Sequence, residues 1–146
     1  MNKKKYTIVQ ILPALNTGGV ERGVVEISKA LIDNHFRSIV VSSGGHMVPQ
    51  LKRNGAVHYE LDVKTKNPLK WPKIRKKLKI ILENEKVDLI HLCSRAPAWI
   101  AFPLGSILGI PVITSVHMRF RKTNFLKKYY NSILTKGNAI IAISKH

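Results

Sequence analysis

The sequence predicts an α/β domain built on a doubly wound, Rossmann-like parallel sheet. Short apolar runs recur along the chain without strict alternation of apolar and polar residues, as is typical of strands covered on both faces. Segments with apolar residues at helical spacing separate these runs. A double glycine, Gly18-Gly19, follows the first run, where a strand would turn into its helix. Together these observations favour alternating strands and helices around one sheet.

The strands are expected at six compact apolar runs, each short enough for a strand and followed by turn-forming or polar residues. These runs are 8–15, 38–43, 57–61, 87–92, 112–116 and 139–143. The second run ends at Gly44-Gly45, a second double glycine.

The helices are expected between the strands. The first follows Gly18-Gly19, and the others are expected at 47–53, 68–85, 97–108 and 122–136. The first helix has an apolar face formed by Val20, Val24, Ile27 and Leu31. The helix at 68–85 has one formed by Trp71, Ile74, Leu78 and Ile81, with a lysine-rich remainder. The helix at 97–108 is apolar all round and is expected to be buried, with Pro97 in its first turn and Gly109 at its end.

Length and composition fit one folded domain. The chain has 146 residues, of which 45% are hydrophobic, enough to bury a substantial core. The single cysteine, Cys93, excludes a disulfide framework, and its apolar surroundings predict a buried, unreactive thiol. We find no signal-peptide pattern, and the longest apolar stretch, 96–108, is too short to cross a bilayer. A cytoplasmic location is therefore expected.

The formal net charge of +17 predicts attraction to anions, whether nucleic acid, anionic lipid or a phosphorylated substrate. Basic residues gather at Lys70, Lys73, Arg75, Lys76, Lys77 and Lys79, and again at Arg119, Arg121, Lys122, Lys127 and Lys128. These groups predict peripheral association with an anionic membrane surface, the alternative being solvated helix faces. No nucleic-acid partner is expected, because no recognisable binding motif is present; a basic nucleic-acid-binding domain remains the rival interpretation.

The residues that follow each strand form the expected site, because ligands of doubly wound sheets bind above the carboxyl ends of the strands. These residues are polar, glycine-rich and cationic: 16–19, 43–46, 94–95 and 117–119. The helix that follows Gly18-Gly19 would present free N–H groups to an anion, although the same glycines would suit a loop that only needs to turn. No nucleophile elbow, Walker motif or complete dinucleotide fingerprint is present, and we expect no metal or cofactor. The pattern favours an anion or a polyol as ligand.

Four segments together resemble the N-terminal half of a GT-B glycosyltransferase, and the nearest group is the retaining enzymes of family 4 that act in lipopolysaccharide, capsule and glycolipid synthesis. The segments are Gly18-Gly19-Val20-Glu21-Arg22, His91-Leu92-Cys93-Ser94-Arg95-Ala96-Pro97, Thr114-Ser115-Val116-His117 and Ala142-Ile143-Ser144. They occur in the order of the family and cover essentially the whole chain. The resemblance implies transfer of a sugar from a nucleotide sugar to a lipid-linked or polysaccharide acceptor.

The resemblance also implies roles for individual residues. Gly18 and Gly19 would place backbone N–H groups beside the donor diphosphate, and His117 would act at the transferred sugar as the catalytic residue. Ser94, Arg95 and Arg119 would contact the acceptor. His91 is expected to be a hydrogen-bonded core residue.

The resemblance covers one domain of a two-domain enzyme. Residues 1–146 correspond to the acceptor-side domain, and the donor-binding C-terminal domain is not in this sequence. Ser144, a preferred helix N-cap, stands two residues before the last, so a truncated or split gene product is expected. This chain alone is expected to be inactive; an alternative is a non-catalytic subunit that completes a split transferase with a separately encoded C-terminal half.

Overall fold

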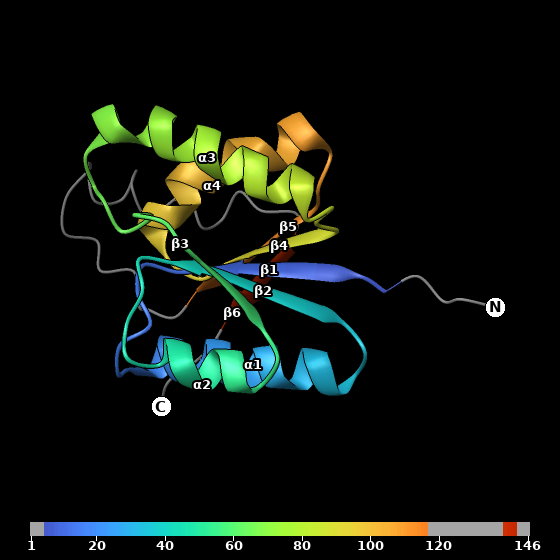
Figure 1. Ribbon diagram of the computed structural model, residues 1–146. Helices are drawn as coiled ribbons and strands as arrows, with labels where there is room; N and C mark the ends of the chain where they lie inside the picture. The colour runs from blue at the N-terminus through green and yellow to red at the C-terminus, as the bar shows by residue number, and fades with distance from the viewer. Residues whose placement is uncertain (1–4, 117–138, 143–146) are drawn as a thin grey trace.

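The computed structural model describes residues 5–116 and 139–142 of the chain. These residues contain a six-stranded sheet in the order β3-β2-β1-β4-β5-β6, in which every neighbouring pair is parallel (Figure 1). The strands are β1 (Thr7–Ile11), β2 (Arg37–Ser42), β3 (Val57–Glu60), β4 (Leu89–Leu92), β5 (Val112–Val116) and β6 (Ala139–Ala142). The predicted parallel sheet is confirmed.

Helices cover both faces of the sheet, as a doubly wound fold requires. The helices are α1 (Gly19–Asp33), α2 (Val48–Arg53), α3 (Trp71–Asn84), which follows the 3-10 turn η1 (Pro68–Lys70), and α4 (Arg95–Leu108). α1 and α2 lie on one face, and α3 and α4 lie on the other (Figure 1). The chain order changes direction between β1 and β4, so the loops after these two strands meet at the carboxyl edge. The helix expected at 122–136 lies outside the described residues.

The core has two parts, one on each face of the sheet. Val9 and Ile11 of β1 pack on the α3–α4 side, whereas Leu12 and Leu15 pack with α1 and α2 on the opposite side. All four side chains are fully buried. No helix in the described part of the chain is both long and apolar enough to cross a membrane.

Two element boundaries and one helix face differ from the sequence prediction in ways that have a clear physical cause; other boundaries shift by one to three residues. β1 ends at Ile11 rather than continuing to residue 15, since Pro13 lacks the N–H that a central strand needs. α4 begins at Arg95, two residues before Pro97. α3 buries Ile74, Leu78 and Leu82, whereas Ile81 is only partly buried, because an i, i+4, i+8 row faces the sheet.

Arg75 joins α3 to α4 at the point where proline interrupts α4. Pro103 lies inside α4 and cannot donate a hydrogen bond to the carbonyl of Trp99. The Arg75 guanidinium donates to that carbonyl at 3.1 Å and to the carbonyl of Ile100 at 2.8 Å. The rings of Trp71 and Trp99 stack beside this contact with centroids 6.1 Å apart. Arg75 is thus a structural residue and does not belong to the basic surface on which the sequence placed it.

We expect Arg75→Ala to lower the free energy of unfolding by about 2–3 kcal/mol, because it removes two partly buried, charge-assisted hydrogen bonds between α3 and α4. Urea denaturation measures this value. The matched control is Lys76→Ala, an exposed neighbour on α3, which should change the free energy of unfolding by less than about 0.5 kcal/mol. Equal effects of the two substitutions would show that Arg75 contributes nothing through α4.

Candidate functional site

The loops after β1 and β2 continue to pair beyond the end of the sheet. The Ser43 N–H donates to the Pro13 carbonyl at 3.0 Å, and the Leu15 N–H donates to the Gly44 carbonyl at 2.9 Å. The Met47 N–H in turn donates to the Leu15 carbonyl at 2.9 Å. This pairing fixes the segment before Gly18 against the loop that leads into α2.

The second double glycine makes this pairing possible. Gly44 and Gly45 have φ angles of +96° and +150°, which side-chain-bearing residues rarely adopt. A Cβ atom at Gly45 would overlap the backbone carbonyl of Leu15, which has no room to move. A Cβ at Gly44 would meet the Glu60 carboxylate. The sequence shows both glycines, but only the structure shows that they are required for this contact between loops.

Hydrogen bonds that involve side chains support the same loops. Ser42 Oγ lies 2.7 Å from His58 Nε2 and accepts a hydrogen bond from the Gly44 N–H at 3.0 Å. Burial and the nearby Lys52 charge lower the pKa of His58 below its usual value, which favours the neutral ring. Closer to α1, Thr17 Oγ1 lies 2.6 Å from His46 Nε2 and links the two loops directly.

Gly18 and Gly19 lie where the sequence places them, at the beginning of α1. Gly18 is the N-cap, and its carbonyl accepts the first intrahelical hydrogen bond, from the Arg22 N–H at 3.0 Å. No side chain in the described part of the chain caps this helix, so its first N–H groups face the carboxyl edge. The φ of Gly18 is 172°, an extended conformation that any residue adopts. Its backbone geometry therefore does not require glycine, and a Cβ there would meet only the flexible Glu21 carboxylate.

Ser94 and Arg95 lie at the neighbouring strand end. The Cys93 N–H donates to the Ile11 carbonyl at 3.0 Å, which holds the end of β4 beside the end of β1. Ser94 is the N-cap of α4 and Arg95 is its first residue; both are partly buried. The structure thus brings these residues to the same edge as Gly18. His117 and Arg119, which the sequence also assigns to the site, lie outside the described residues.

The interior next to this edge is polar and inert. His91 is buried and its Nε2 forms a hydrogen bond with Ser115 Oγ, as expected of a core residue. Cys93 is also buried, and burial raises the pKa of its thiol to about 12, so the thiol is not a nucleophile at neutral pH. Among residues 5–116 and 139–142, no His, Cys, Asp or Glu side chains cluster as metal ligands would.

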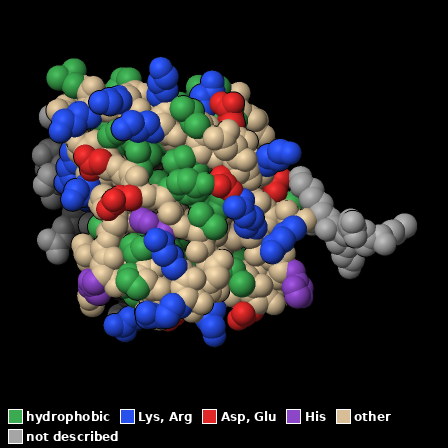
Figure 2. Space-filling view, viewed as in Figure 1, with side chains coloured by type: hydrophobic (Ala, Val, Ile, Leu, Met, Phe, Trp, Pro, Cys, Tyr) green, Lys and Arg blue, Asp and Glu red, His purple; other side chains and the backbone are tan. Residues whose placement is uncertain are grey.

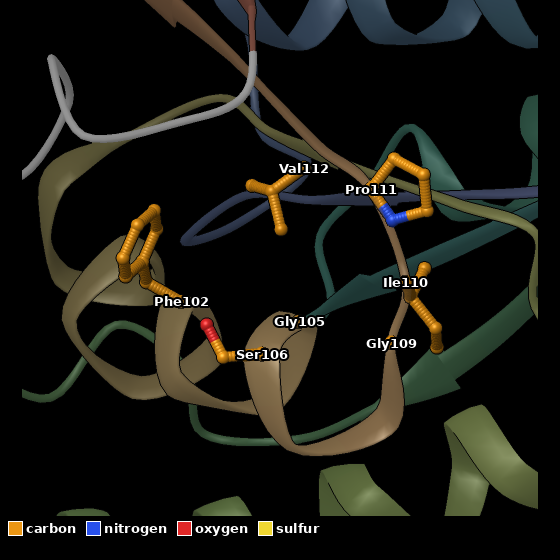
Figure 3. A pocket seen from close by; sticks show the side chains of 7 residues that line it. All are labelled: Phe102, Gly105, Ser106, Gly109, Ile110, Pro111 and Val112. Carbon is orange, nitrogen blue, oxygen red and sulfur yellow. The ribbon is translucent and has the colours of Figure 1, made fainter.

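A cleft of about 490 Å³ opens beside Gly18, between α1 and α2. Its polar lining consists of Thr17, Gly18, Arg22, Glu26, His46, Gln50 and Arg53. A second hollow, of about 260 Å³, lies between the end of α4 and the beginning of β5, lined by Phe102, Ser106, Pro111 and Val112 (Figure 3). Because β5 begins there, this hollow lies at the amino edge of the sheet, away from the glycine loops. Of these two hollows, the α1–α2 cleft is the one that adjoins the candidate site.

The fold matches one half of GT-B glycosyltransferases. A glycosyltransferase from Rickettsia africae superimposes with a TM-score of 0.81 and 37% identity over 97% of this chain and 38% of its own length. HepE of Anabaena in complex with UDP and glucose superimposes with a TM-score of 0.73 and 15% identity over 92% of this chain and 37% of its own. MurG of Acinetobacter baumannii superimposes with a TM-score of 0.67 and 15% identity over 97% of this chain and 42% of its own.

The sequence profile of Glycosyltransferase Family 4 matches residues 17–146. The chain belongs to this family. It spans about two fifths of the length of the three solved structures. No curated protein matches it.

We expect the two double glycines to differ in their effect on stability. Gly45→Ala should lower the free energy of unfolding by about 2–4 kcal/mol, because it combines an unfavourable φ with a clash against backbone. Gly18→Ala should change it by less than about 1 kcal/mol, because only the flexible Glu21 side chain must move. Urea denaturation of both variants measures the difference. A larger loss for Gly18→Ala would contradict the assignment of Gly45 as the constrained position.

Proposed function

We propose that this chain is the acceptor-side domain of a retaining glycosyltransferase that transfers a sugar from a nucleotide sugar to a lipid-linked or polysaccharide acceptor of the cell envelope. Membership of Glycosyltransferase Family 4 is the observation that carries this proposal. HepE, a neighbour in fold, has been solved with UDP and with UDP-glucose, which supports a nucleotide sugar as donor. The solved structures are more than twice as long as this chain. A second domain, in the part that this chain does not cover, would supply most of the donor contacts.

The donor diphosphate is proposed to lie against the beginning of α1. The uncapped N–H groups that follow Gly18 and Gly19 carry the positive end of the helix dipole, and hydrogen bonds from N–H groups to a charged phosphate are the strong ones. Ser94 and Arg95 at the adjacent strand end are proposed to contact the acceptor, together with Arg119. His117 is proposed to act at the transferred sugar.

The whole reaction needs both domains in this proposal, so the chain alone is proposed to be inactive. A second candidate is a split enzyme in which a separately encoded C-terminal half binds this domain. The basic nucleic-acid-binding domain has no support from the fold comparisons.

Peripheral docking on an anionic membrane is proposed for the α3 side of the domain. Figure 2 shows Lys and Arg side chains gathered over the region of α3. The exposed members on η1 and α3 are Lys70, Lys73, Lys76 and Lys77. Leu69 on η1 is 89% exposed among them, which suits a side chain that enters the lipid headgroup region. We infer attachment at the cytoplasmic face of the membrane, where lipid-linked acceptors would be within reach.

Transfer should appear only when the second domain is present. We expect no turnover of labelled UDP-sugars by this chain alone, and turnover after it is joined to the C-terminal half of the Rickettsia africae relative. The variant with Gly18→Val and Gly19→Val in the joined protein should lose at least about tenfold in affinity or turnover. The N–H groups remain, but the branched side chains would hold the diphosphate away from them, and each charge-assisted hydrogen bond weakened in this way is worth about 1.5–3 kcal/mol. Undiminished affinity and turnover in a folded variant would contradict the proposed diphosphate site.

Membrane docking should depend on charge and on Leu69. Sedimentation with phosphatidylglycerol vesicles should fall at least tenfold for the Lys73→Glu, Lys77→Glu double variant at low salt, since each basic residue near the surface contributes about 1 kcal/mol. Leu69→Ser should weaken the binding that persists at high salt, where screening removes the charge contribution. The matched control is Lys29→Glu with Lys52→Glu, two exposed lysines on α1 and α2. Equal losses from this control would show attraction by net charge alone.

A further inference from the structure

The α1–α2 cleft has features that neither the family membership nor the donor site explains. It extends from Thr17 and Gly18 at the carboxyl edge to Gln50 and Arg53 on α2, one to two helical turns along the facing helices. Its volume of about 490 Å³ falls in the range of small-molecule sites. It therefore has room for a sugar-sized ligand in addition to the diphosphate proposed at the beginning of α1.

The lining is cationic and comes from two elements. Arg22 belongs to α1 and Arg53 belongs to α2, and neither forms an ion pair within the described part of the chain. The one acidic side chain in the lining is Glu26, so the arginines leave a positive excess. Two guanidinium groups from facing helices suit a phosphate, which accepts paired N–H donors in a fixed geometry.

The polar end of the cleft is held in place before any ligand arrives. The Thr17–His46 hydrogen bond of 2.6 Å joins the two loops at its mouth. The Leu15 pairing with Gly44 and Met47 fixes the backbone behind them. Val25 and Met47 give the cleft an apolar floor. A rigid wall with an apolar floor and cationic sides lowers the cost of ordering the site on binding.

We propose that the α1–α2 cleft binds the phosphate group of a phosphorylated ligand through Arg22 and Arg53. Identification of that ligand with the acceptor rests on the transferase function proposed above. Glu26 sets the orientation: its carboxylate repels phosphate and accepts hydrogen bonds from hydroxyl groups, so the sugar or glycerol part lies on its side of the cleft.

The test is a titration of the 146-residue chain followed by NMR chemical shifts, with inorganic phosphate and glycerol 1-phosphate as probes. We expect saturable shifts at residues of the cleft. Arg22→Gln and Arg53→Gln should each weaken binding at least tenfold, whereas Glu26→Gln should strengthen it about threefold. The matched controls are Lys29→Gln on α1 and Lys52→Gln on α2, exposed residues that do not line the cleft and should change binding less than twofold.

A second experiment distinguishes a lipid phosphate from a soluble one: vesicles that contain phosphatidic acid replace the soluble probes. This arm uses the Lys73→Glu, Lys77→Glu background, in which the α3 docking surface is removed. Loss of the remaining vesicle binding in Arg53→Gln, with Lys52→Gln unchanged, would assign the cleft to a lipid phosphate; binding of glycerol 1-phosphate alone would assign it to a soluble one. Equal losses in the arginine and lysine variants, or shifts that never saturate with any probe, would overturn the proposal.

Neither arm uses a nucleotide sugar or measures transfer. Failure of phosphate binding in a chain that supports transfer in the joined protein would reject the cleft assignment and leave the transferase function standing. Phosphate binding by a chain that supports no transfer in the joined protein would reject the transferase function and leave the cleft assignment standing.

Discussion

The contact between the loops after β1 and β2 determines the geometry of the whole carboxyl edge. The Leu15 N–H donates to the Gly44 carbonyl, and the Leu15 carbonyl accepts from the Met47 N–H. The two backbones lie so close together at Gly45 that no side chain would fit there. α1 begins directly after the loop held in this way and α2 directly after its partner, so the relative position of the two helices follows from it. Ser42 and His58 extend the support to the edge strand β3. A change at Gly45 would therefore move both walls of the cleft, since its carbonyl also accepts a hydrogen bond from the Val48 N–H at the beginning of α2.

The fold is largely predictable from the sequence because its signals are local. Apolar runs and helical spacing place all six strands, and each helix within the described residues, close to their observed positions. The errors occur where a local pattern meets a tertiary constraint. Leu12 and Leu15 continue the apolar run of β1, but they leave the sheet and pack under α1 and α2. Arg75 looks like a surface charge among lysines, but it compensates for Pro103, which is 28 positions further along the chain.

The candidate site is predictable in part, for a related reason. The rule that ligands lie above strand ends finds Gly18, Ser94 and Arg95, which follow β1 and β4 directly. Arg22 and Arg53 escape the rule, because they belong to helix faces that meet only when α1 and α2 pack side by side (Figure 1). The sequence offers a signal for Arg22 alone, because Arg22 belongs to the motif that begins at Gly18-Gly19. The two double glycines show the same limit, since identical dipeptides have different φ angles and different roles.

The chemical character of the edge suggests how the domain would divide the work of transfer with a partner domain. Within the described residues, the edge offers backbone N–H groups, hydroxyl groups and guanidinium groups, together with the Glu26 carboxylate and the His46 ring, which is hydrogen-bonded to Thr17. The thiol of Cys93 and the ring of His91 are buried and engaged. N–H, hydroxyl and guanidinium groups bind and orient anions and stabilise developing negative charge, and they need no proton transfer of their own to do so. A diphosphate leaving group accumulates negative charge as the sugar departs, so N–H groups aimed at it would bind the transition state more tightly than the ground state. Under the proposed function, the domain would accelerate transfer by position and electrostatics, and the glycine-fixed loops would matter because such stabilisation requires donors that are already in place.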